Sequence, residues 1–201
     1  MIILGIAGGS GSGKTTFAKR VLSKSKGTHS QVTLLSQDSY YLSEPSEKLR
    51  VDSDYNFDHP DAFDWDLLSK QLRDLKAGKS IQIPHYDYKT HRRTDETLEI
   101  APPRVLILEG IFALWEAEVR SLLDVKVFLH VEADIRFIRR LHRDVRERGR
   151  SHDEISHRYY QMVRPMHQLY VEPTRKYADL IVGEENETAA LVLASYVQSR
   201  I

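Results

Sequence analysis

The stretch GIAGGSGSGKTT, residues 5–16, is the feature that most limits what this chain can fold into. Gly8, Gly13, Lys14 and Thr15 satisfy the spacing G-x-x-x-x-G-K-[ST], and an apolar run precedes the loop. Glycines let backbone N–H groups turn toward an anion, and the N-terminus of the following helix adds partial positive charge. The motif therefore predicts a phosphate-binding loop between a buried strand and a helix.

The whole loop is expected to surround the phosphates of a nucleotide. In such loops the lysine, here Lys14, neutralises the β and γ phosphates, and the Thr15 hydroxyl can ligate Mg²⁺. Glu109 ends the apolar run VLILE, where such folds carry the acidic residue that holds the metal directly or through water. We therefore expect a nucleoside triphosphate with Mg²⁺. The predicted nucleotide-binding residues are Gly8, Gly9, Ser10, Gly11, Ser12, Gly13, Lys14, Thr15 and Thr16.

Short segments that are apolar on both faces recur along the chain, as in strands buried within a parallel sheet. They lie at residues 2–7, 32–36, 104–110, 125–131 and 179–182. Helical patterns lie between them, at residues 14–25, 64–76 and 115–123. This alternation predicts an α/β fold of the P-loop NTPase type, with a parallel five-stranded sheet and helices on both faces. We expect one domain over residues 1–201.

Residues 79–101 interrupt the alternation of strands and helices. They contain two extended runs on either side of the polar stretch KTHRRTD, residues 89–95. This pattern predicts a β-hairpin inserted into the α/β domain.

Residues 134–150 contain an arginine-rich helical pattern that we interpret as a lid over the phosphates. An apolar stripe is expected to anchor the helix, and its members are Ile135, Ile138, Leu141 and Val145. Another face carries Arg136, Arg140 and Arg143. Arg148 and Arg150 flank a glycine at which the helix can end and arginines can reach over phosphates. An ordinary solvated helix, partly neutralised by Asp144 and Glu147, is the alternative.

Composition and charge exclude several classes of function. The 29 acidic and 29 basic side chains balance, which argues against a surface built for nucleic acid. There is no cysteine, so disulfides, zinc–thiolate sites and cysteine nucleophiles are excluded. The first residues lack a basic leader, and no apolar run reaches about 18 residues. We therefore expect a soluble, cytoplasmic protein without nucleic-acid or membrane partners.

Three classes of protein use a triphosphate in this way: a hydrolytic switch, a mechanical ATPase and a kinase with a small acceptor. The guanine signature N-K-x-D of GTPase switches does not occur in the sequence. A kinase needs an acceptor site beside the γ phosphate, a general base and a lid that excludes water. Only the rest of the sequence can supply these parts.

Two aspartates are candidates for the acceptor side. Asp38 follows the second predicted strand, at the edge where open parallel sheets bind ligands, and could take a proton from a hydroxyl or help to position Mg²⁺. A turn-forming aspartate is the alternative. Asp58 lies in the acidic loop of residues 52–66 and could bind the vicinal hydroxyls of a sugar, or simply face solvent.

In order and spacing, a series of motifs resembles the uridine kinases, also called uridine-cytidine kinases, from about residue 2 to 183. The motifs are GGSGSGKTT, QDSYY, NFDHPDAFD, PHYDYKTHRR, ILEGIFAL, RFIRRLHRDVRERGR and VRPMHQLYVEPTRKYADLIV. Phosphoribulokinases and pantothenate kinases share the same core and are the nearest alternatives. Lys14 argues against a phosphoribulokinase, because that family replaces it.

The resemblance implies transfer of the γ-phosphoryl group of ATP or GTP to the 5′-hydroxyl of uridine or cytidine, which gives UMP or CMP. Asp38 then corresponds to the catalytic base, and it can also contribute to the Mg²⁺ site with Thr15 and Glu109. Arg143 and Arg148 correspond to lid arginines that contact the phosphates, alongside Lys14. A homo-oligomer, commonly a tetramer, is the family's expected assembly.

The same resemblance assigns the nucleoside pocket. Asp58 and Arg140 match positions that hold the ribose hydroxyls. Tyr86, His91 and Arg150 match those that contact the pyrimidine edge. The aromatic and apolar walls of the pocket correspond to Tyr41, Phe57 and Tyr88.

One position departs from the family pattern. Where the family has glutamine near the ribose, this chain has Arg158. Ser151 and Glu154 have the spacing of a capping box, so a helix is expected to begin there, and Glu154 with Arg158 could form a surface ion pair. We favour a place in the sugar pocket for Arg158. A regulatory protein that binds nucleotide without an acceptor remains a competing class, but it leaves the hairpin and the acidic loop unexplained.

Overall fold

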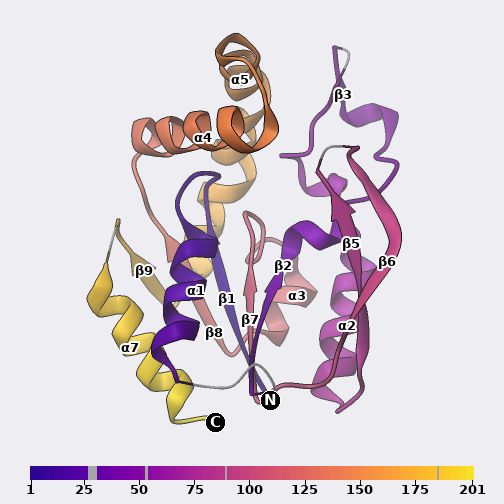
Figure 1. The fold of residues 1–201 in the computed structure, drawn as a ribbon. Coiled ribbons are helices and arrows are strands. Elements are labelled where there is room, and N and C mark those ends of the chain that lie inside the picture. Colours follow the sequence, from indigo (N-terminus) through magenta and orange to yellow (C-terminus); the bar gives the residue numbers. More distant parts are fainter. Residues whose placement is uncertain (27–30, 53, 89, 185) are drawn as a thin grey trace.

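The computed structural model describes residues 1–26, 31–52, 54–88, 90–184 and 186–201. Its centre is a five-stranded sheet in the order β2-β7-β1-β8-β9, in which neighbouring strands are parallel (Figure 1). The strands are β1 (Ile2–Gly8), β2 (Val32–Ser36), β7 (Val105–Glu109), β8 (Val125–Leu129) and β9 (Leu180–Val182). The predicted parallel five-stranded sheet is confirmed, and each strand ends within two residues of its predicted bounds.

Helices cover both faces of the sheet, as predicted. On one face, α1 (Lys14–Lys24) and α7 (Glu187–Gln198) pack together over one core. On the other face lie α2 (Trp65–Lys76) and α3 (Ala117–Leu122), the latter two residues shorter at its start than expected. Successive residues of β1 point to opposite cores, Ile3 to the α2 side and Leu4 to the α1 side. This explains why the strand sequences are apolar without alternation.

The phosphate-binding loop connects β1 directly to α1. Gly11 has φ +80°, a left-handed conformation that glycine adopts without strain. A Cβ at this position would lie 2.2 Å from the carbonyl oxygen of Arg136, so a side chain would also collide with the backbone of α4 (Ala133–Arg148). The loop and α4 therefore lie so close together that a side chain at position 11 would not fit without a shift of the backbone.

The inserted hairpin consists of β5 (Ile81–Asp87) and β6 (Arg92–Ile100), which pair antiparallel beside α2 (Figure 1). The hairpin prediction is confirmed, but β6 begins at Arg92, inside the polar stretch that we expected to be a loop. Residue 89 of that stretch lies outside the described residues. Arg93 attaches the hairpin, because its guanidinium donates to Asp64 Oδ2 at 2.9 Å and to the Tyr40 carbonyl at 3.1 Å.

α4 crosses above the carboxyl ends of the strands (Figure 1), but it does not pack as predicted. Ile138 and Val145 of the expected anchoring stripe are 51% and 37% exposed, whereas Arg136, Arg140 and Asp144 are buried. The surface beneath the helix is polar backbone and hydroxyl: Arg136 Nε donates to the Val131 carbonyl at 3.0 Å. The helix therefore anchors through charged hydrogen-bond donors, and the apolar-stripe prediction was wrong.

The remaining elements are short and surround the sheet's upper edge. A small ribbon pairs β3 (Arg50–Val51) with β4 (Asp54–Tyr55). After α4 come α5 (His152–Arg158) and α6 (Arg164–Met166), joined by a π-helical turn over Tyr159–Val163. A second π-helical turn over His167–Val171 and a 3₁₀ turn over Glu172–Tyr177 follow α6. Other 3₁₀ turns cover Gln37–Tyr40, Glu47–Leu49 and Pro60–Ala62.

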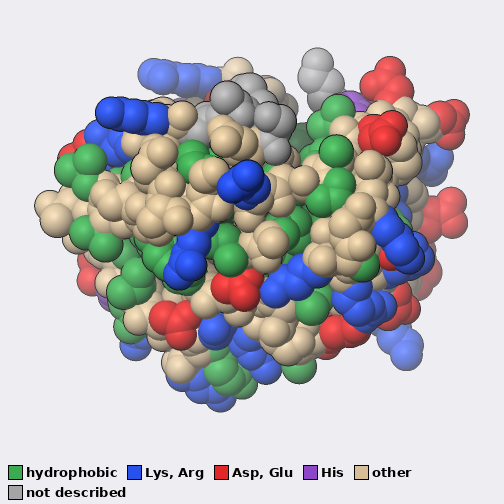
Figure 2. Space-filling view, turned by 90° about the horizontal axis from the view of Figure 1, so that it is seen from below, with side chains coloured by type: hydrophobic (Ala, Val, Ile, Leu, Met, Phe, Trp, Pro, Cys, Tyr) green, Lys and Arg blue, Asp and Glu red, His purple; other side chains and the backbone are tan. Residues whose placement is uncertain are grey.

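Both termini lie at the opposite end of the molecule (Figure 1). Figure 2 shows that Lys and Arg side chains there are interspersed with acidic and apolar ones. Within the described part of the chain, no helix combines the length and apolarity that a membrane crossing needs.

Replacing Arg93 tests how the hairpin is attached. Arg93→Met keeps most of the side-chain length but leaves the half-buried Asp64 carboxylate without its cation. We expect the free energy of unfolding to fall by about 1 to 3 kcal/mol in urea denaturation, as for hydrogen bonds to charged groups. Arg92→Met is the matched control, because Arg92 is the exposed neighbour on the same strand. Equal losses in the two variants would contradict this role.

Candidate active site

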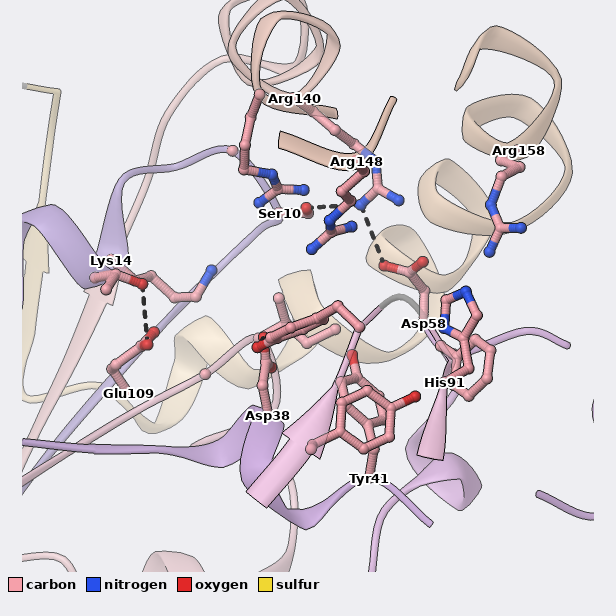
Figure 3. A pocket seen from close by; sticks show the side chains of 18 of the residues that line it. Ser10, Lys14, Asp38, Tyr41, Asp58, His91, Glu109, Arg140, Arg148 and Arg158 are labelled. Atoms are coloured by element: carbon pink, nitrogen blue, oxygen red, sulfur yellow. Dashed lines mark hydrogen bonds and ion pairs between the residues drawn. The ribbon is translucent and has the colours of Figure 1, made fainter. Parts of the chain in front are cut away.

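A cavity lies at the carboxyl ends of β1, β2 and β7, between α4 and the β5–β6 hairpin (Figure 3). Gly110 and Ile111, which the sequence analysis did not single out, also line it. The predicted site residues in its wall are Ser10, Gly11, Lys14, Thr15, Asp38, Tyr41, Phe57, Asp58, Tyr86, Tyr88, His91, Glu109, Arg140, Arg143, Arg148, Arg150 and Arg158. Residues from the loop, the hairpin and α4, far apart in sequence, therefore converge on one space.

The remaining loop residues lie elsewhere. Ser12, Gly13 and Thr16 line a second cavity together with Phe17, Arg20, Leu129, Arg139 and Gly183. Gly8 and Gly9 line neither of these two cavities. The lining residues outside the loop were missed from the sequence because no motif marks them: Phe17, for example, is an ordinary apolar position of α1.

Lys14 stands at the phosphate end of the main cavity. Its side chain is almost fully buried, and Nζ donates to the Gly9 carbonyl at 3.1 Å. Burial lowers the pKa of Lys14, while the charges of Glu109 and Asp38 oppose that shift. An anion entering beside the ammonium would favour its charged form further.

Glu109 ends β7 opposite the loop. Its Oε1 accepts hydrogen bonds from the Thr15 hydroxyl at 2.9 Å and from the Ser36 hydroxyl at 3.1 Å (Figure 3 shows Glu109 beside the loop). Burial raises the pKa of Glu109, and the Lys14 charge acts against this. Ser36 was not predicted, because a serine at the end of a strand carries no distinctive signal.

The donor set at Glu109 suits Mg²⁺, which binds proteins through one or two oxygen ligands and takes the rest from phosphates and water. A hydroxyl and a carboxylate already in contact provide such ligands. Among the described residues, no cluster of three or more histidines or carboxylates is arranged to hold a metal by itself.

Asp38 lies in the 3₁₀ turn that follows β2, as its predicted position requires. Tyr88 from the hairpin donates its hydroxyl to Asp38 Oδ2 at 3.0 Å. Burial, and then the Asp38 charge, raises the pKa of Tyr88, so the phenol keeps its proton at neutral pH. The guanidinium carbon of Arg148 lies 5.3 Å from the Tyr88 ring centre. Tyr88 thus connects Asp38 to the arginines of α4.

Aromatic rings form the wall at the other end of the cavity. Tyr41 lies 5.1 Å from Tyr86 and 5.7 Å from Phe57, and Phe57 stacks on His91 at 4.9 Å between ring centres. The Tyr86 hydroxyl is buried and has no hydrogen-bond partner among the described residues. Burial, with Arg150 and Arg148, lowers the pKa of His91, which keeps the imidazole neutral. These groups can stack a flat ring and hydrogen-bond its edge.

Asp58 and Arg140 join the two ends of the cavity. Arg140 Nη1 donates to Ser10 Oγ at 2.8 Å and lies 3.8 Å from Asp58 Oδ1 (Figure 3). Both side chains are largely buried. The predicted ligand role of Asp58 is therefore more consistent with its position than a solvated loop.

Arg158 occupies the cavity wall and is only 9% exposed. It forms an ion pair with Asp54 of β4, whereas Glu154 lies 3.4 Å from Arg150. The helix start at Ser151 is confirmed, because Ser151 Oγ accepts from the Glu154 N–H. The surface pair between Glu154 and Arg158 does not form, because the longer arginine reaches a carboxylate outside its own helix.

The chain is similar in sequence to known proteins over nearly its whole length. Residues 3–189 match the family described as Phosphoribulokinase / Uridine kinase family. The uridine kinases of Staphylococcus aureus strains JH9 and Newman are each 46% identical to it over 201 residues, covering 99% of this chain and 96% of theirs.

Solved structures share the fold at lower identity. A possible uridine kinase from Bacillus stearothermophilus has a TM-score of 0.61 at 22% identity, covering 90% of this chain and 88% of that one. Phosphoribulokinase from Rhodobacter spheroides has a TM-score of 0.68 at 14% identity, covering 90% and 69%. The resemblance seen in the motifs is confirmed: the chain belongs to the phosphoribulokinase / uridine kinase family.

Proposed function

We propose that this protein is a pyrimidine ribonucleoside kinase, which transfers the γ-phosphoryl group of ATP or GTP to the 5′-hydroxyl of uridine or cytidine and forms UMP or CMP. The observation that carries the proposal is that Lys14, Asp38 and the ring wall of Tyr41 and His91 line one cavity. A phosphate donor and a flat acceptor can therefore meet at one carboxylate. The identity to proteins named uridine kinase supports this acceptor.

The donor would lie along the loop of residues 8–16. Backbone N–H groups and Lys14 bind its phosphates, and the second cavity, with Phe17 and Arg139 in its wall, accommodates its base. Thr15 and Glu109 would hold Mg²⁺, and Asp38 lies in the same cavity wall. Bound there, the ion would neutralise part of the triphosphate charge.

The nucleoside would occupy the ring-lined end. Tyr41 and Phe57 form its apolar walls, while Tyr86 and neutral His91 read the pyrimidine edge. The Tyr86 hydroxyl supports this most, because a buried polar group without a protein partner is costly unless a ligand pairs with it. Asp58, in place beside Arg140, binds the ribose hydroxyls.

Phosphoryl transfer then requires one proton transfer and the replacement of one phosphorus–oxygen bond by another. Asp38 accepts the proton of the 5′-hydroxyl, the freed oxygen bonds to the γ-phosphorus, and the bond to the β–γ bridging oxygen breaks. Tyr88 holds the Asp38 carboxylate in place by donating its hydroxyl hydrogen bond to Oδ2. Arg143 and Arg148 stabilise the charge that spreads over the transferring group.

Two alternative functions remain outcomes of the test. A phosphoribulokinase-like or pantothenate-kinase-like enzyme would take an acceptor without an aromatic base, which leaves the ring wall unused. A regulatory nucleotide-binding protein has no acceptor hydroxyl to deprotonate, so Asp38 would have no role as a base. An acceptor panel of uridine, cytidine, ribulose 5-phosphate and pantothenate, assayed for phosphorylated product, separates them.

Other features of the proposal follow the family. We predict a homo-oligomer, a tetramer, in the cytoplasm, and a single domain over residues 1–201. Nucleic acid and membranes are not expected partners. These stay predictions.

Asp38→Asn tests the proposed base. The amide keeps the shape of the side chain but cannot accept the proton, so we expect kcat for UMP formation to fall by about 10² to 10⁴ fold with KM for uridine changed much less. Steady-state kinetics with uridine and ATP measure both constants. The control is Asp66→Asn, which removes an exposed carboxylate on α2. A kcat within about threefold of wild type would exclude Asp38 as the base.

Arg158→Gln tests the departure from the family pattern. The variant shortens a side chain that lies beyond His91 and away from Lys14 (Figure 3), at the end of the cavity proposed for the nucleoside. We expect KM for uridine to change several fold and the penalty for 2′-deoxyuridine to shift, with KM for ATP nearly unchanged. Arg164→Gln, an exposed arginine on α6, is the control. Unchanged constants for both nucleosides would remove Arg158 from the sugar pocket.

A further inference from the structure

Asp144 is a buried carboxylate that no part of the proposed reaction uses. It lies one turn before the end of α4 and has no exposed surface. Asp144 does not itself line the cavity, whereas several arginines do. Four of these arginines have guanidinium nitrogens within 4 Å of its oxygens: Arg140, Arg143, Arg148 and Arg150.

The two oxygens of Asp144 divide these arginines by role. Oδ1 lies 2.8 Å from Arg143 Nη2 and 3.4 Å from Arg148 Nη1, the two arginines proposed for the phosphates. Oδ2 lies 3.5 Å from Arg140 Nε and 3.6 Å from Arg150 Nη1, the two proposed for the nucleoside. Arg143 also donates a hydrogen bond from Nε to Oδ1 at 2.9 Å, whereas Oδ2 makes ion-pair contacts and has no hydrogen-bond partner among the described residues. One carboxylate is therefore ion-paired with both the phosphate-binding pair and the nucleoside-binding pair.

The backbone of Asp144 also holds the turn that follows α4. Its carbonyl accepts the N–H of Gly149, the residue that ends α4 with φ +65°, and the N–H of Arg150 at 3.3 Å. The chain between Arg148 and Arg150 is thus held to Asp144 by main chain as well as by side chains. A turn held in this way presents both arginines to the cavity.

Charge explains why such a residue is needed. Guanidinium groups gathered in a half-buried space repel one another. Asp58 lies beside Arg140 and Glu154 beside Arg150, but only Asp144 lies within 4 Å of all four arginines among the ion pairs of the described residues. Burial disfavours the charged form of Asp144, but Arg140, Arg143 and Arg148 outweigh it and hold the pKa of the carboxyl below its ordinary value. The cluster still carries more positive than negative charge, which suits an incoming triphosphate.

We propose that Asp144 is a positioning residue for phosphoryl transfer, which sets Arg143 and Arg148 at the donor phosphates in register with Arg140 and Arg150 at the nucleoside before either substrate binds. Arginine side chains that are already in position need no reorganisation during the reaction, whereas unconstrained arginines would have to be ordered in each catalytic cycle. The inference rests on the proposed kinase reaction. Wild-type UMP formation in the same assay separates the two, because failure of the function would appear in the wild type.

The test is Asp144→Asn, which keeps the shape and removes the charge. We expect kcat for UMP formation to fall by about 10 to 100 fold, the range that small misplacement of catalytic groups produces. Dissociation constants for MgATP and for inorganic tripolyphosphate, measured by calorimetry without nucleoside, should stay the same or decrease, because the cluster gains net positive charge. If Asp144 were needed only for folding, the variant would lose kcat and phosphate affinity together, rather than kcat alone.

Two further variants complete the design. Glu147→Gln removes the same charge from an exposed position on α4 and should leave kcat within about twofold of wild type, because exposed charges interact weakly. Asp144→Glu keeps the charge but moves it by one methylene. Positioning predicts a lower kcat for this variant too, with tripolyphosphate affinity retained, whereas mere neutralisation predicts wild-type kcat.

The outcomes decide the proposal in each case. A kcat within about threefold of wild type for folded Asp144→Asn would overturn it, as would a parallel loss of kcat and tripolyphosphate affinity in proportion to unfolded protein. Thermal unfolding of each variant establishes the folded fraction at the assay temperature. If Asp144→Asn does not fold, Asp144→Glu alone decides, and wild-type kcat in that variant would reject positioning.

Discussion

The parallel register of β1, β7 and β2 is the constraint on which the rest of the structure depends. Ile6 and Ser36 both pair with Glu109, so the phosphate-binding loop after β1 and the turn that carries Asp38 after β2 are held at the level of that carboxylate. Lys14 and Glu109 are both buried there, and burial alone would drive each toward its neutral form. Each charge opposes that tendency in the other, so the pair must stay together. A shift of one residue in either strand pairing would separate the proposed base, the proposed metal ligands and the loop.

The second determinant is the way α4 reaches this edge. The helix buries a charged face against the loop, through Arg140 on Ser10, and leaves Ile138 exposed. Burial of an arginine side chain costs free energy unless a carboxylate or another hydrogen-bond acceptor lies next to it. Asp144 forms an ion pair with the buried Arg140. The arrangement places an excess of positive charge over the loop, where the proposed triphosphate donor would supply the missing negative charge. On this proposal, donor binding and the order of α4 depend on one electrostatic balance.

Local signals in the sequence were sufficient to predict the sheet, the phosphate-binding loop, the hairpin and the helix start at Ser151, because apolar periodicity, glycine spacing and caps act over a few residues. The packing of α4 was predicted wrongly because counting apolar positions assumes an apolar surface beneath the helix, and here that surface is polar. The contacts of Arg158 with Asp54 and of Ser36 with Glu109 join residues far apart in sequence. No spacing rule encodes such pairs, and the same is true of the second cavity, which brings Leu129 and Gly183 to the loop.

In the proposed reaction, donor and acceptor meet in one cavity, and phosphate moves only when both are present. The most direct measurement follows ADP and UMP together, with ATP and Mg²⁺, in the presence and absence of uridine. The account predicts equal amounts of ADP and UMP with uridine, and ADP formation slower on the order of 10² fold without it, because water is a poorly positioned acceptor in this site. Hydrolysis of ATP at the same rate with and without uridine, with no UMP formed, would contradict the account.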